Sequence, residues 1–447
     1  MRFFLHGAHV PHRKNTADMA PVRMDPPAVI TLPLSMHIGK SAIPVVKVGD
    51  EVFVGTLVAK EDGFVSSAVY SSVSGKVKSV SDITSNSGAI VKAIKIESDG
   101  NMTSDPGIAP PAVTTKEEFL EAVKSSGIVG LGGAGFPSHV KLTVPADKSA
   151  DVLIINGAEC EPYITSDTRT MIDRVDDIRF GIENILKYVG VSKVIIAIEE
   201  NKASAIESMR AMAKEMENVE VYVLPSLYPQ GAEKVIVYHT TGRVVAAGKL
   251  PIDVGAIVIN CTTVAAIGNY IKTGMPLVRK CVTVDGGAFR SAMNISVPIG
   301  TPISAVVDFV GGFKETPHTV LLGGPMMGTS VVDFELPILK NTNALLALTE
   351  VDARRKKETA CIHCGACANH CPLNLNPAAF MKAYRLDNSE ELKRLRADIC
   401  MECGCCSYVC PAAKPLVETN KLAKAKLRTY LAEQKKKEEE KEGKQNG

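Results

Sequence analysis

The chain has 447 residues, about three domains at ~150 residues each, and 45% of them are hydrophobic, which is enough for buried cores. Its 51 basic and 49 acidic residues give a net charge of +2, only 5% are aromatic and none is Trp, so no nucleic-acid partner is expected. No apolar run approaches the ~18 residues that span a bilayer, so no transmembrane segment is predicted.

The first 110 residues predict a small β module. Alternating valines on both sides of a Gly49–Asp50 turn indicate short strands. The stretch VKVGDEVFVGTLVA at 46–59 resembles biotinyl and lipoyl carrier domains, which are barrel sandwiches with a modified Lys at a hairpin tip. Here the tip lies near Asp62-Gly63-Phe64, and Lys60 is out of place. A structural module is therefore favoured over a swinging-arm carrier.

Residues 115–275 alternate between predicted helices and strands. Thr115 and Glu118 form a capping box that opens a helix ending near Gly127. The remaining elements are strands at 152–155, 194–198, 219–224 and 257–260, and helices at 172–189, at 206–216 and from 260 to 272. This alternation indicates a mainly parallel sheet with helices on its faces.

The last third of the chain changes character twice. Residues 276–345 are again β-rich and contain the run LLGGPMMG at 321–328. Residues 350–430 are predicted to be helical and are rich in Cys. The tail at 431–447 is mostly Lys and Glu, which predicts a solvated or frayed end.

Two cysteine runs dominate the helical part, each with the spacing C-x2-C-x2-C-x3-C-P. This spacing is typical of [4Fe–4S] clusters, and in two-cluster ferredoxins the fourth Cys ligates the other cluster. Zinc sites pair two ligands with two at wider separation, so zinc is not favoured. The ninth thiol, Cys405, is interpreted as a small loop residue. One predicted ligand set is Cys361, Cys364, Cys367 and Cys410, and the other is Cys400, Cys403, Cys406 and Cys371.

Two loops indicate a cofactor site. The run GLGGAGFP at 130–137 has the form GxGxxG, but it follows a helix and precedes the first strong strand, unlike a dinucleotide fingerprint. Its amides can approach a phosphate with Lys141 as counter-charge, and a tight structural turn remains the alternative. Asn156, Glu159 and Glu161 follow the first parallel strand, at the edge where α/β proteins bind ligands.

Together these motifs resemble the NADH-oxidising flavoprotein subunit of respiratory complex I and, more closely, the RnfC family of the Rnf electron-transport complex. The matching segments are 130–142, 155–169, 228–233 (YPQGAE) and 260–263 (NCTT), and the resemblance covers about residues 1–425. It implies four modules: an N-terminal barrel-sandwich-like β module (1–110), a Rossmann-like α/β flavin domain (115–275), a β-grasp-like module (276–345) and an α-helical ferredoxin domain with two [4Fe–4S] clusters (350–430).

The resemblance also implies site residues for non-covalent FMN and for NAD(H). The expected FMN residues are Gly130, Gly132, Lys141, Asn156, Glu159 and Asn260, with Thr263 near the phosphate. For NAD(H), Phe136 is expected at the adenine and Glu161 and Glu233 at the ribose or nicotinamide, with Tyr228 and Gly231 in the same motif. Hydride transfer belongs to the flavin, so no catalytic side chain is assigned.

The function implied is that of an ion-translocating ferredoxin:NAD+ oxidoreductase subunit. Such a subunit is peripheral, on the cytoplasmic face of the cell membrane. Its implied partners are the membrane subunits, the iron–sulfur B-type subunit and, indirectly, ferredoxin. Two alternatives remain at this point: a soluble flavin/iron–sulfur reductase such as a microcompartment cobalamin reductase, and a flavin-free electron-wire subunit.

Overall fold

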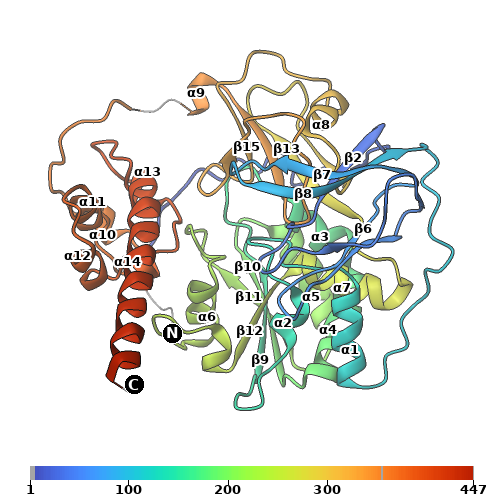
Figure 1. Cartoon of the computed structure of the whole chain (residues 1–447), viewed down its shortest axis with the longest axis horizontal. Coiled ribbons are helices and arrows are strands. Elements are labelled where there is room, and N and C mark those ends of the chain that lie inside the picture. The colour runs from blue at the N-terminus through green and yellow to red at the C-terminus, as the bar shows by residue number, and fades with distance from the viewer. Residues whose placement is uncertain (1–5, 354–355, 446–447) are drawn as a thin grey trace.

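The computed structural model describes residues 6–353 and 356–445, so the last two residues of the charged tail lie outside it. The C-terminal helices form a lobe at the left of Figure 1, beside a body in which the other three modules pack together. Within the described ranges, no helix is both long enough and apolar enough to cross a membrane.

The N-terminal module contains two small antiparallel sheets, in the orders β2-β8-β7-β4 and β3-β5-β6. Alternating apolar side chains, among them Ile30, Leu32 and Ile94, are fully buried between the sheets. The expected β module is therefore confirmed. Its strands are β2 (Val29–Pro33), β3 (Ile43–Pro44), β4 (Glu51–Val52), β5 (Leu57–Lys60), β6 (Val69–Tyr70), β7 (Gly75–Thr84) and β8 (Ile90–Ser98).

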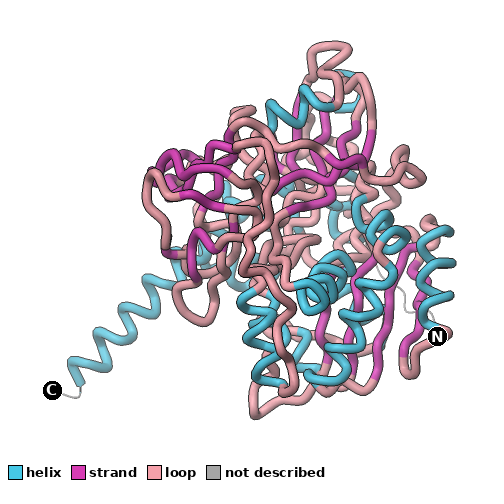
Figure 2. Tube along the Cα trace, turned by 90° about the vertical axis from the view of Figure 1, so that its right-hand side faces the viewer, coloured by secondary structure: helices cyan, strands magenta, loops and turns pink. Residues whose placement is uncertain are grey.

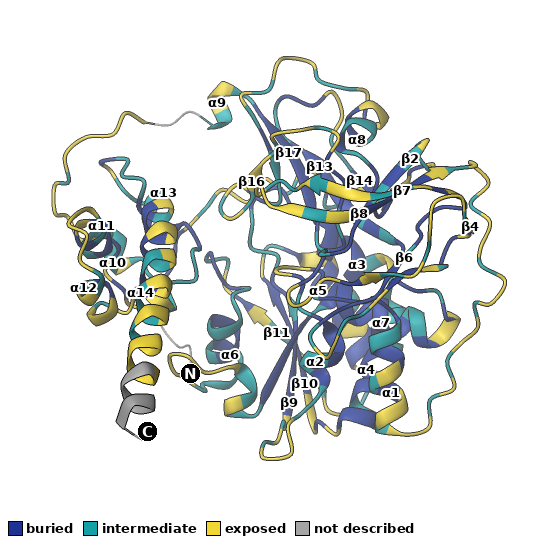
Figure 3. Ribbon diagram, viewed as in Figure 1, coloured by how far each residue is buried: buried dark blue, intermediate teal, exposed yellow. Residues whose placement is uncertain are grey.

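The α/β module is built on a parallel sheet in the order β11-β10-β9-β12, as predicted. Strand β9 is buried on both faces: Leu153 and Ile155 join one core cluster, and Val152 and Ile154 join another. Figure 3 shows this burial as dark blue along β9 and β10. The strands are β9 (Val152–Gly157), β10 (Lys193–Glu199), β11 (Val219–Leu224) and β12 (Ala256–Asn260).

Helices cover both faces of this sheet, and the predicted capping box at Thr115 is present. The helix expected across 172–189 is broken at Arg174, whose φ of −128° and ψ of 39° are not helical. Arg174 separates a helix that is almost entirely buried from an amphipathic one. The helices are α1 (Lys116–Ser125), α2 (Ser138–Leu142), α3 (Ser166–Asp173), α4 (Val175–Val189), α5 (Ala203–Ala213), α6 (Glu233–Thr241), η1 (Pro251–Val254) and α7 (Cys261–Thr273).

The third module is a mixed six-stranded sheet in the order β1-β14-β13-β17-β15-β16. Its edge strand β1 comes from the N-terminal segment and runs parallel to β14. Buried Lys340 ties this module to its two neighbours, because its Nζ donates to Ala68 O (2.6 Å) and Gly127 O (2.7 Å). The elements are β1 (Val22–Arg23), β13 (Arg279–Asp285), β14 (Met293–Pro298), α8 (Ile303–Phe309), β15 (Thr319–Leu322), β16 (Thr329–Ser330) and β17 (Ala344–Leu348).

The C-terminal lobe is helical, as predicted, around a core that includes Phe380, Leu392 and Leu427. Its last helix projects away from the body in Figure 2. Residues 435–439 are exposed, so the expected solvated tail is confirmed, but they are helical and not frayed. The elements are α9 (Glu350–Ala353), α10 (Ala366–Asn369), α11 (Pro377–Arg385), α12 (Ser389–Arg394), η2 (Ala397–Ile399), α13 (Cys405–Tyr408) and α14 (Leu416–Gln445).

Candidate functional site

Two asparagines end adjacent parallel strands at the carboxyl edge of the α/β sheet. Asn156 of β9 and Asn260 of β12 are paired in register. Asn260 Oδ1 accepts from Thr263 N (3.2 Å) and so caps α7, while Asn156 Nδ2 donates to Gly231 O (2.8 Å). Three of the predicted motifs therefore meet at the edge where α/β proteins bind ligands.

The glycine loop lies over the first turn of α7. Gly130 N donates to Phe136 O (2.8 Å), which closes the loop, and Leu131 N donates to Thr263 Oγ1 (3.0 Å). A Cβ on Gly132 would overlap the amide of Asn260, so only glycine allows this approach. The loop amides and the helix N-terminus together form the kind of surface that attracts a phosphate.

Lys141 of α2 and Glu233 of α6 form an ion pair beside this loop. Both side chains are partly exposed, at 29% and 43%. The sequence analysis assigned them to different ligands, the FMN phosphate and NAD(H). In the structure each charge is already balanced by the other, so both assignments remain predictions.

Glu159 holds helix α3 in place. Its carboxylate accepts from Asp167 N (2.6 Å) and Thr168 N (3.2 Å) in the first turn of that helix, and also from the Thr168 hydroxyl. Burial raises the pKa of this carboxyl. The acceptors face the helix, and contact of Glu159 with FMN remains a prediction.

Sequence reasoning missed two residues of this region. Lys14 Nζ donates to the carbonyls of Glu159 (2.7 Å), Glu161 (2.8 Å) and Ile164 (2.6 Å), which pins the loop after β9. Asp167 accepts from Asn260 Nδ2 (2.6 Å) and from a threonine hydroxyl of α7. Lys14 gives no local signal in its irregular segment, whereas Asp167 lies inside a recognised motif and was detectable.

Glu161 lies beneath the turn that joins β15 and β16. Its Oε2 accepts from Met326 N (3.0 Å), and burial raises the pKa of the carboxyl to about 7. A Cβ on Gly324 would overlap this carboxylate, so the turn packs directly against it. In this structure Glu161 joins two modules, and its expected role toward NAD(H) is not tested.

The second cysteine run docks at the same place. The hydroxyl of buried Tyr228 donates to Cys403 O (2.8 Å), and Cys405 Sγ donates to Tyr228 O (3.7 Å). A Cβ on Gly404 would lie 2.9 Å from Met326 O, so the cysteine loop touches the β15–β16 turn as well. Cys405 is therefore part of a contact between modules and is more than a loop filler.

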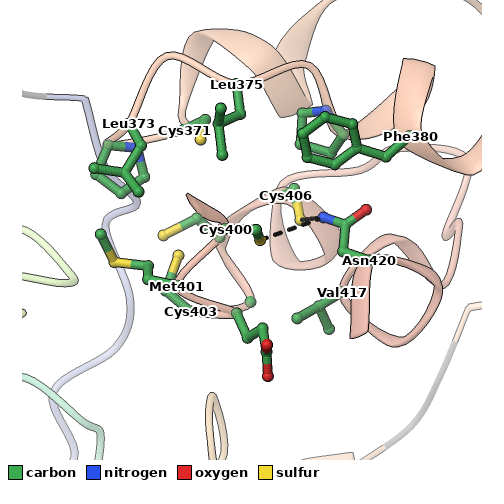
Figure 4. A pocket seen from close by; sticks show the side chains of 15 residues that line it. Cys371, Leu373, Leu375, Phe380, Cys400, Met401, Cys403, Cys406, Val417 and Asn420 are labelled. Atoms are coloured by element: carbon green, nitrogen blue, oxygen red, sulfur yellow. Dashed lines mark hydrogen bonds between the residues drawn. The ribbon is translucent and has the colours of Figure 1, made fainter. Parts of the chain in front are cut away.

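Cysteines from both runs line one cavity, shown in Figure 4. Cys371 of the first run faces the same space as Cys400, Cys403 and Cys406 of the second. Cys367 and Cys410 likewise pack against one shared apolar cluster. Four thiols around one space fit the donor set of a [4Fe–4S] cluster.

The other first-run cysteines are closer to the surface, and Cys364 is exposed. Among the described residues, no three Cys, His, Asp or Glu side chains converge as ligands of a single metal ion would. A four-iron cluster instead spreads its thiolates over its corners.

Models of known protein families match four consecutive segments. They are described as the RnfC barrel sandwich hybrid domain (residues 3–101), the Nuo51 FMN-binding domain (123–269), the SLBB domain (281–330) and the 4Fe-4S dicluster domain (360–414). The four-module fold class is thus confirmed, and FMN and iron–sulfur clusters are supported as cofactors. The finer module boundaries given above remain predictions.

Curated relatives are similar over most of the chain. The RnfC-type component of the proton-translocating ferredoxin:NAD(+) oxidoreductase complex of Clostridium ljungdahlii is 42% identical, over 88% of this chain and 87% of its own. Its counterpart in the Na(+)-translocating complex of Acetobacterium woodii is also 42% identical, over 84% of this chain and 85% of its own. The chain belongs to the RnfC family.

A third member of the RnfC family broadens this similarity. The corresponding component of the ion-translocating oxidoreductase complex of Rhodobacter capsulatus is 41% identical, over 93% of this chain and 81% of its own. The resemblance seen in the sequence is confirmed. The alternatives of a cobalamin reductase and of a flavin-free wire are not favoured.

Proposed function

We propose that this member of the RnfC family passes electrons between ferredoxin-side carriers and NAD(H) in an ion-translocating ferredoxin:NAD+ oxidoreductase. The chain is one component of a multi-subunit translocase. The observation that carries the proposal is the contact of Tyr228 with Cys403, which seats the second cysteine run against the FMN-type domain. Bound FMN exchanges electrons with NAD(H) in pairs and with iron–sulfur clusters singly.

The residues at the sheet edge fit FMN. The glycine loop and the N-terminus of α7 offer backbone N–H groups to its phosphate. Next to the Asn156–Gly231 contact, Gln230 is 1% exposed, and its Oε1 has no partner in the described part of the chain. A buried acceptor of this kind fits a cofactor ring that carries N–H donors.

The cysteines fit two clusters with exchanged ligands. Cys371 shares its cavity with the second run, which supports its assignment to the cluster of Cys400, Cys403 and Cys406. The packing of Cys410 near Cys367 supports the converse assignment. Exchange of ligands holds the two clusters close together, as single-electron transfer requires.

The finer proposals concern partners and place. Electrons reach this subunit from the iron–sulfur B-type subunit and the membrane subunits, with ferredoxin as the indirect donor. The chain is peripheral, on the cytoplasmic face of the cell membrane. NAD(H) binds on the flavin side, near Phe136 and Glu233, and the protein positions the two cofactors without a catalytic acid or base.

Ferredoxin-dependent NAD+ reduction by membranes tests this function. Membranes that lack the chain should be inactive, and the wild-type chain should restore activity. Cys281→Ser, in β13 and outside both runs, should restore it as well, whereas Cys403→Ser should not. Full activity in membranes without the chain, or with Cys403→Ser, would refute the proposal.

A further inference from the structure

Helix α14 places one amide side chain against the second cysteine run. Asn420 is 1% exposed, and its Nδ2 lies 3.8 Å from Cys400 Sγ and 3.9 Å from Cys406 Sγ. Figure 4 shows Asn420 reaching toward both sulfurs from the helix that closes one side of the cavity. The two sulfurs belong to the same predicted cluster, whichever cysteine is its fourth ligand.

The orientation of this amide is set by chemistry. Thiolate sulfurs accept hydrogen bonds and cannot donate, so the NH2 group and not the carbonyl oxygen faces them. Asn420 Oδ1 has no partner within the described residues. A buried amide that leaves its oxygen unpaired costs free energy, and the two N–H to sulfur contacts offset part of that cost.

The loop that carries these sulfurs is tied to the same helix one turn further on. Lys424 Nζ donates to Cys400 O (2.7 Å) and to Glu402 Oε1 (3.0 Å). The carboxylate of Glu402 balances the lysine charge. Lys424 therefore fixes the distance between α14 and the loop, while Asn420 alone addresses the sulfurs. At the first run, Cys410 Sγ instead receives a backbone N–H from Lys414 at 3.5 Å.

Donors to ligand sulfurs favour the reduced cluster. Reduction adds an electron, and the added negative charge is shared with the cysteine sulfurs. Hydrogen bonds to the sulfurs are among the factors that set cluster potentials, because they stabilise this charge. We propose that Asn420 is a positioning residue that raises the reduction potential of the second-run cluster through its N–H groups.

This inference rests on the proposed function only in requiring that the second run hold a cluster. It makes electron uptake by the second-run cluster more favourable than the cysteine loop alone would make it. That cluster is the one seated against the FMN-type domain through Tyr228 and Cys403. Asn420 thus acts on the cluster nearest the flavin side of the chain.

A redox titration followed by EPR tests the role of Asn420 in the full chain. Asn420→Leu keeps the approximate shape and removes the donors. The potential of the second-run cluster should fall by roughly a tenfold change in its reduction equilibrium, which is about 59 mV for one electron. Asn420→Asp, which replaces the donor with an acceptor, should lower it further. The first-run cluster in the same sample is the control and should keep its potential.

Iron content and a third variant keep the test decisive. Asn420→Ser can still donate one O–H and should shift the potential less than Asn420→Leu. Unchanged potentials in an iron-replete variant, equal shifts of both clusters, or loss of the cluster in every variant would each overturn the proposal. Absence of clusters from the wild-type chain would instead refute the proposed function.

Discussion

Replacing Gly404 with Ala probes the contact that joins the cysteine-rich lobe to the body. Gly404 has a φ of +82°, and an added Cβ would lie 2.9 Å from Met326 O. Gly365 occupies the same position in the first run, with a φ of +74°. Its Cβ would come no closer than 3.9 Å to another atom, Asn369 Nδ2. Gly365→Ala is therefore a matched control without the contact.

The two substitutions separate backbone strain from the module contact. A left-handed conformation costs a residue with a Cβ about 1–2 kcal/mol, and both variants share this cost. Gly404→Ala also forces the Cβ against a backbone oxygen, and overpacking of this kind costs about 1–3 kcal/mol. The difference corresponds to roughly a 5- to 150-fold shift toward release of the lobe.

Hydrogen–deuterium exchange measures that release. In Gly404→Ala, peptides that cover 323–328 and 403–408 should exchange faster than in the wild type, because each faces the other across the contact. In Gly365→Ala, exchange at 323–328 should stay at the wild-type rate. Equal exchange at 323–328 in the two variants would refute the contact as the source of the effect.

Further predictions concern the clusters, the flavin and the module contacts. Cys410→Ser should abolish the same EPR signal as Cys364→Ser; loss of the second-run signal alone would contradict exchanged ligation. Lys141→Ala should lower the FMN retained after gel filtration, and unchanged flavin content would exclude a phosphate contact. Glu161→Ala leaves Met326 N without its acceptor, at about 1–3 kcal/mol, and should speed exchange of that amide, whereas Glu161→Gln should not. Burial lowers the pKa of Lys340 to about 7, against about 10.4 in the unfolded chain, so the unfolded state binds more protons between these values. The free energy of unfolding should therefore rise with pH from about 7 to 10, by up to about 1.4 kcal/mol per pH unit, and urea unfolding of Lys340→Met should lack this rise; equal slopes would contradict the shift.

The modules were predictable because their signals are local. Apolar runs buried on both faces, such as 152–155, predict a parallel sheet from a few adjacent residues. The spacing of each cysteine run likewise indicates cluster ligation within a short stretch. The break at Arg174 was missed because the helical spacing of apolar residues continues across it, although the two helices pack differently.

Contacts between distant segments were not predictable in the same way. Nothing near Tyr228 indicates that its hydroxyl meets Cys403, and nothing near Lys340 indicates carbonyl partners in two other modules. Lys141 and Glu233 were both identified as site residues, but spacing along the chain does not reveal that opposite charges from α2 and α6 meet. The site motifs were therefore found, while their mutual pairing required the fold.

Anaerobic titration of the purified chain with NADH, followed by visible absorbance and EPR, tests the central claim most directly. The claim is that FMN and the cysteine-bound clusters form one electron path to NAD(H) within this subunit. NADH should bleach the flavin absorbance, and the signals of reduced clusters should appear in the same sample. A folded chain that carries its iron but holds no flavin, or whose flavin and clusters do not respond to NADH, would contradict it.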